Sequence, residues 1–178
     1  MLIASELYSS IIGFMPAGSH WSQGSPQSIL MTKCAEGLVD AFNAATVSPG
    51  ACNPSSPTPH SHTVMLNGAA LQAKIESCGF TGLASNLSAS MNLGVSGYLS
   101  GVCFFGIAPD GCPPHSHLFG LGGSVSGFSS AIHPASFNGQ YVSGYLNAIA
   151  SAVYSYIPLK ISISTVSHGA PLGSHTLS

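Results

Sequence analysis

Histidine is the residue type through which this chain could do the most chemistry. A His-Ser-His triplet occurs at 60–62 and again at 115–117, each directly after a proline. In an extended chain the side chains of residues i and i+2 point to the same side, so each triplet could present two imidazoles to one cation. Imidazole nitrogen suits zinc, copper, iron and nickel. The sequence therefore predicts a metal site built from His60, His62, His115 and His117.

Two arrangements could complete this site. The four histidines could meet within one chain, or a threefold axis could bring together three copies of one triplet, with iron or zinc as the expected metal. One alternative is that the triplets are polar loop residues without a metal. Another is a pH-sensing module, because neutral imidazoles gain charge in mild acid. The remaining histidines are expected in loops or interfaces: His20, His133, His168 and His175.

The chain is unusually poor in charge for its 178 residues. Charged residues make up 4% of the sequence, with three lysines, no arginine and five acids, whereas about 25% is usual in a soluble domain. Without arginine the chain has few groups to neutralise phosphates, which excludes nucleic acid as an expected partner. Because surface charge normally keeps soluble proteins apart, we expect partners to cover much of so neutral a surface.

Catalytic and disulfide motifs are missing from the sequence. Four of the five carboxylates fall in expected helices, and Asp110 lies in a Pro-Asp-Gly turn, its favoured setting. No nucleophile elbow or HExxH motif occurs, so we expect no enzyme, with a hydrolase that uses Cys112 and His115 as the alternative left open. The five cysteines include no CxxC pair, which favours free buried thiols.

Membrane insertion and secretion are not expected either. The stretches 87–109 and 141–159 carry no formal charge and are long enough to span a bilayer. Serine and asparagine dilute both stretches, so a small integral membrane protein is only an alternative. No basic residues precede a long apolar run at the N-terminus, so no secretory signal is expected.

Apolar spacing predicts a mainly α protein with long Pro/Gly-rich loops and a short C-terminal β segment. Helices are expected from a cap at Ser5 to a stop at 16–18, and over 26–45, 66–77, 85–100 and 138–156, the last with a stop at Pro158. The stretch 161–166 alternates with period two and predicts a strand.

The clearest of these predictions is the helix 26–45. Ser25 followed by Pro26 is a strong start signal, with a capping serine before proline at the first helical position. One apolar stripe follows at helical spacing: Leu30, Cys34, Leu38 and Phe42, with Ile29 and Val39. We expect this stripe to pack in the core or at an interface.

The chain also repeats itself loosely. Pro-His-Ser-His recurs at an offset of 55, and Val95–Leu99 returns as Val142–Leu146 at an offset of 47. Because the offsets differ, the pattern indicates a degenerate internal repeat. It divides the chain into an N-terminal helix and loop (1–24), a first helix-loop-His-Ser-His unit (25–83), a second unit (84–137), and a C-terminal helix, strand and tail (138–178).

The stretch Leu38–Gly50, continuing to Pro59–Val64, resembles small virion proteins of tailed bacteriophages. Such proteins join a helix to a charge-poor segment rich in glycine, proline and serine. Some phage fibre and spike proteins use His-x-His pairs around a threefold-axis metal, which either triplet here would match, although fibres are β-structured and this chain is expected to be helical. The resemblance covers mainly 30–66, with an echo at 95–118. It implies a structural virion component of the tail, baseplate or neck, with copies of itself and other virion proteins as partners.

Overall fold

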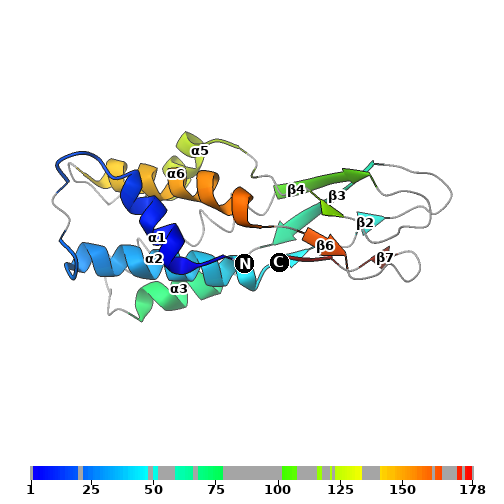
Figure 1. The fold of residues 1–178 in the computed structure, drawn as a ribbon, viewed down its shortest axis with the longest axis horizontal. Helices are drawn as coiled ribbons and strands as arrows, with labels where there is room; N and C mark the ends of the chain where they lie inside the picture. The colour runs from blue at the N-terminus through cyan, green and yellow to red at the C-terminus, as the bar shows by residue number, and fades with distance from the viewer. Residues whose placement is uncertain are drawn as a thin grey trace.

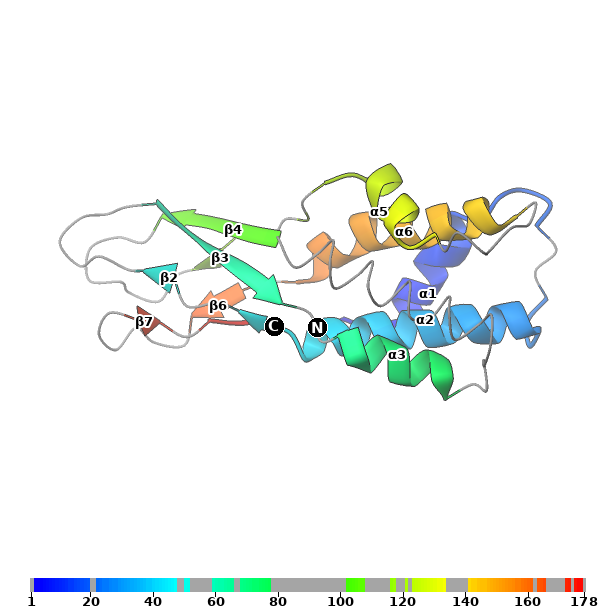
Figure 2. The ribbon, with the colours of Figure 1, turned by 180° about the vertical axis from the view of Figure 1, so that it is seen from behind.

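Helices gather at one end of an elongated molecule, and short strands gather at the other (Figures 1 and 2). The structure is a computed structural model that describes residues 2–19, 22–47, 50–51, 59–65, 68–77, 102–107, 116–117, 121, 123–133, 141–161, 163–165, 172–173 and 175–177. Side chains are described in 2–19, 22–45, 69–77, 121, 123–133 and 141–161. Within that part of the chain, the predicted mainly α class is confirmed.

The helices are α1 (Ala4–Gly13), α2 (Pro26–Asn43), α3 (Gly68–Glu76), α5 (Val125–Ala131) and α6 (Val142–Lys160). Helix α1 lies across α2 and α6, α3 packs along α2, and α5 packs on α6 (Figure 1). The expected helix 85–100 lies outside the described residues. No helix in the described part of the chain combines the length and the apolar character needed to cross a bilayer.

Helix α2 begins where the sequence predicts. The Ser25 hydroxyl accepts a hydrogen bond from the Ser28 backbone N–H, and Pro26 occupies the first turn. The predicted stripe is buried in its main members, Leu30, Cys34, Leu38 and Phe42 with Val39. Ile29 is 42% exposed and does not belong to the core.

Two predicted helix ends are wrong. Helix α1 begins at Ala4, with Ile3 as a cap that makes no side-chain hydrogen bond, so Ser5 does not cap it. Pro158 does not stop α6, which continues to Lys160. A proline removes one helical N–H. The helical bonding nevertheless resumes after Pro158, where the Ile161 N–H donates to the Ile157 carbonyl at 3.1 Å.

Helix α5 is absent from the sequence-based prediction, which left this Gly/Ser-rich tract without structure. Ser124 caps it by accepting a hydrogen bond from the Gly127 N–H at 3.1 Å. Phe128 and Ile132 are fully buried, so α5 is held by its contact with α6.

One hydrophobic core joins all these helices. Its fully buried large side chains are Leu7 and Ile11 from α1, Leu38 and Phe42 from α2, Leu71 and Ile75 from α3, Phe128 and Ile132 from α5 and the turn after it, and Ile149 from α6. Cys34 is a buried thiol that forms no disulfide, as expected of the cysteines. Each helix therefore contributes one apolar stripe to a shared interior, which is how amphipathic helices gain most of their stability.

The strands are β1 (Thr46–Val47), β2 (Gly50–Ala51), β3 (Pro59–Met65), β4 (Val102–Ile107), β5 (Ser116–His117), β6 (Ile163–Thr165), β7 (Leu172–Gly173) and β8 (His175–Leu177). They pair antiparallel in the orders β1-β3-β4, β2-β7 and β5-β6-β8. No strand is predicted from the sequence at either segment of the longest pairing, β3 with β4.

Candidate functional site

The structure places three of the four predicted metal-binding histidines in strands. His60 and His62 lie two residues apart in β3, opposite Gly106 and Phe104 of β4. His117 ends β5, where it pairs with Ile163, and His115 lies outside the described residues. Among the described residues, no group of three or more His, Cys, Asp or Glu side chains could hold a metal. The metal site remains a prediction.

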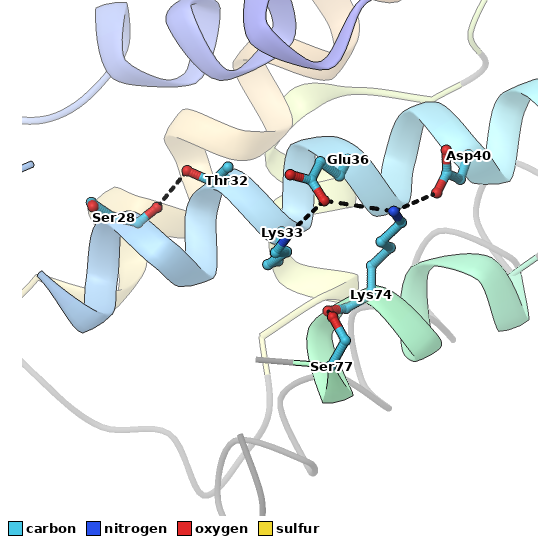
Figure 3. Close-up of polar contacts among 7 residues, drawn as sticks. All are labelled: Ser28, Thr32, Lys33, Glu36, Asp40, Lys74 and Ser77. Carbon is cyan, nitrogen blue, oxygen red and sulfur yellow. Dashed lines mark hydrogen bonds and ion pairs between the residues drawn. The ribbon is translucent and has the colours of Figure 1, made fainter. Parts of the chain in front are cut away.

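The best-defined cluster of chemically active side chains lies between α2 and α3 (Figure 3). The ammonium of Lys74 reaches from α3 to two carboxylates one turn apart on α2, at 3.6 Å from Glu36 and 3.4 Å from Asp40. Lys33 approaches the same Glu36 oxygen at 2.7 Å. Sequence reasoning treated these carboxylates as solvated helix faces or caps, and it did not pair them with α3.

Close packing brings Lys74 within reach of α2. A Cβ at Gly37 would lie 2.8 Å from the Leu71 Cδ1 atom and 2.9 Å from its Cα. Only glycine permits that approach, because real Cβ contacts are not so short. The Leu71 and Ile75 side chains are fully buried beside it. The ion pairs therefore sit at the edge of an apolar contact that already holds α3 in place.

A second cluster joins the start of α1 to the end of α6. The Ile3 N–H donates to the Tyr156 hydroxyl at 3.1 Å. That hydroxyl lies 3.0 Å from a Glu6 carboxylate oxygen and 3.3 Å from the Ile3 carbonyl. It has one proton, so it donates to one of these acceptors at a time. Lys160 lies 2.9 Å from the same Glu6 oxygen and 5.7 Å from the centre of the Tyr156 ring.

The charges of this cluster stabilise one another. Hydrogen bonds from Lys160 and then from Tyr156 lower the pKa of Glu6. The same contact with Glu6 raises the pKa of Lys160, while burial is the main cause that raises the pKa of Tyr156. Glu6 lies in the first turn of α1 and Lys160 in the last turn of α6. Each charge also suits the dipole of its own helix.

Together the two clusters contain every lysine of the chain, and each one forms an ion pair: Lys33, Lys74 and Lys160. On α3, the Gln72 amide also donates to Glu76. Ion pairs of this partly exposed kind contribute little energy each, about 0–1 kcal/mol in general. The pairs made by Lys74 and Lys160 each join two helices, so they suit the fixing of one helix against another.

Comparisons of the chain with protein-family models, with curated proteins and with solved structures give no match.

Proposed function

We propose that this chain is a structural subunit of a phage particle, located in the tail, baseplate or neck. In this proposal it acts by packing against copies of itself and against other virion proteins. It has no catalytic role, and neither nucleic acid nor a membrane is among its partners. The proposal rests on the resemblance of 30–66 to small virion proteins and on how the helical end uses its charge.

The use of charge is the observation that carries the proposal. All three lysines form ion pairs within the chain, and the sequence contains no arginine. Surface charge of one sign normally keeps copies of a soluble protein apart. With a formal net charge of -2 and its lysines paired, this chain has little electrostatic repulsion to overcome when copies meet. Low repulsion favours a subunit whose surface is covered in an assembly.

The finer architecture belongs to the same proposal. The helical end would be the scaffold, because the core gathers there. Long Pro/Gly-rich loops, the short C-terminal β segment and the degenerate repeat with its two His-Ser-His triplets would reach neighbouring subunits.

The oligomeric state of the purified chain tests this proposal. We expect light scattering and native mass spectrometry to show a defined homo-oligomer. Proteomics of phage particles from the native source should detect the chain. Replacing Leu159, which is 82% exposed, by Glu provides a charged surface variant that should keep the helical circular dichroism signal. A chain that is monomeric at every concentration and missing from the particles would overturn the proposal.

Metal binding by the histidines is a second candidate function, and one observation favours it. In β3 the backbone at His60 and His62 is extended, which is the geometry that lets two imidazoles two residues apart share a cation. Where the ligands come from three copies of the chain, the metal would also tie the oligomer together.

Elemental analysis of the purified assembly tests this candidate. Iron or zinc at one metal per three chains indicates a threefold-axis site made by one triplet, and twice that amount indicates both triplets. One metal per chain favours four histidines from the same chain. The double variant H60A/H62A should lose metal, whereas His133→Ala, an exposed histidine after α5, should keep it. Metal content unchanged both in H60A/H62A and in H115A/H117A, or no metal in the native assembly, rejects this candidate.

A further inference from the structure

A polar hollow lies between α5 and α6, away from both ion-pair clusters. Its volume is about 390 Å³, within the range of about 300–1,000 Å³ typical of small-molecule sites. Its lining consists of Ser126, Ser129, Ser130, His133, Ser143 and Asn147. These residues offer hydroxyl, amide and imidazole groups, and none of them is an acid, a lysine or an arginine.

Ser129 distinguishes this hollow from an ordinary surface depression. It is only 9% exposed, while the other five lining residues are exposed. In the described part of the chain its hydroxyl has no hydrogen-bond partner. Ser28, the other buried polar residue described, accepts a bond from the Gly24 N–H at 2.9 Å. A buried hydroxyl without a partner is costly, so such a group calls for an explanation.

The chemistry of the lining selects the class of ligand. An anion would need a cation, but no lysine lines the hollow and all three are paired elsewhere. An apolar ligand would leave the hydroxyls and the Asn147 amide without partners, at a cost in affinity. A neutral molecule with several hydroxyl groups can both donate to and accept from these groups.

We infer that the hollow between α5 and α6 binds a neutral polyhydroxylated molecule of the size of a monosaccharide. Ser129 contacts it from the buried side, and Ser143 and Asn147 contact it from α6. This site is independent of the proposed assembly role, because it uses none of the paired charges and needs no second copy of the chain.

Protein-observed NMR of the isotope-labelled full chain and calorimetry test the inference. The probes are the methyl glycosides of glucose, galactose, mannose and N-acetylglucosamine, with inorganic phosphate as the anion control. We expect at least one glycoside to bind, to shift the amide resonances of Ser129, Ser143 and Asn147, and to be unaffected by phosphate.

Variants separate binding from folding. Ser129→Ala and Asn147→Ala should each weaken the glycoside by about tenfold. Ser155→Ala should leave binding unchanged, because Ser155 lies further along α6 and donates to the Ala152 carbonyl outside the hollow. Without ligand, Ser129→Ala should keep or raise the melting temperature, because it removes an unpartnered buried hydroxyl. The inference is wrong if no glycoside binds at millimolar concentration, if phosphate binds instead, or if the two variants bind as the native chain does.

Discussion

Two helix contacts at the same end of the molecule use lysine in different ways. Between α2 and α3, Lys74 lies beside a glycine contact and two fully buried side chains, and it is shared by two carboxylates. Between α1 and α6, one buried tyrosine hydroxyl joins the Ile3 backbone to Glu6, and Lys160 completes the group.

The comparison separates a contact that rests on apolar packing from one that relies on a polar group. The α2–α3 contact is redundant, since its packing would persist if Lys74 were lost. The polar part of the α1–α6 contact depends on one hydroxyl, whose loss would leave the Ile3 N–H and Glu6 without that partner. We therefore expect apolar truncation to dominate at the first contact and loss of a polar group to be felt at the second.

The largest effect is expected from Leu71→Ala. Removing a fully buried leucine should lower the free energy of unfolding by about 2–5 kcal/mol, because a cavity remains where α3 meets α2. Urea denaturation followed by circular dichroism measures this loss. The matched control is Leu159→Ala, because Leu159 is 82% exposed and should change stability by no more than about 0.5 kcal/mol. Equal losses in the two variants would contradict the α2–α3 packing.

Gly37→Ala should produce the next largest loss. Alanine favours a helix over glycine by about 1 kcal/mol, but here its methyl group would meet the Leu71 backbone at 2.9 Å. We expect a net destabilisation of about 1–3 kcal/mol from overpacking. Gly13→Ala in α1 is the control, since an added Cβ there would meet no atom within 4 Å beyond its neighbours and its own helix backbone, and the substitution should be neutral or stabilising. Stabilisation by Gly37→Ala would show that α2 and α3 are further apart.

Tyr156→Phe should cost less, about 0.5–1.5 kcal/mol, because the ring stays and only the hydroxyl is lost. The effect should be local, with faster hydrogen exchange at the backbone amides of the first turn of α1. Tyr141→Phe is the control, because Tyr141 is 40% exposed at the start of α6 and should leave exchange in α1 unchanged. If hydrogen exchange in α1 is the same in both variants as in the native chain, the tyrosine contact is contradicted.

The smallest effect is expected from Glu6→Gln, and it should depend on pH. The pKa of Glu6 in the folded chain is below its ordinary value of 4.5. The ionised Glu6 carboxylate therefore stabilises the fold above pH 4.5, and this stabilisation is lost as the pH falls through the lowered pKa. Near neutral pH the variant should be less stable than the native chain, and in acid the difference should vanish.

Denaturation across a pH series measures this difference, and added salt should reduce it at neutral pH. A double-mutant cycle of Glu6→Gln with Lys160→Met should show coupling between the two residues. A difference that stays constant through the acid range would contradict the ion pair.

Local signals predicted much of the helical end. Ser25 and Pro26 are adjacent in the sequence, so the start of α2 could be predicted without knowledge of its neighbours. Helix α5 could not, because its tract has few apolar residues and only the contact of Phe128 with α6 makes a helix favourable there. Pro158 misled the prediction because the helix continues past it to Lys160, with the Ile161 N–H donating to the Ile157 carbonyl.

The candidate sites divide in the same way. The sequence marked the histidine triplets, whose spacing is local, but neither the clusters around Lys74 and Tyr156 nor the hollow around Ser129. Those depend on residues that are far apart in the chain.

Three properties could be predicted from the amino-acid sequence: the scarcity of charge, the formation of α2 and α6, and the burial of most of their apolar stripes. These properties follow from composition and from the helical period. Which carboxylate each lysine contacts, and which of the many serines is buried, depends on how the helices pack in three dimensions. The physical reason is that ion pairs and hydrogen bonds act over a few ångströms, and such distances between remote residues are set by how the helices pack.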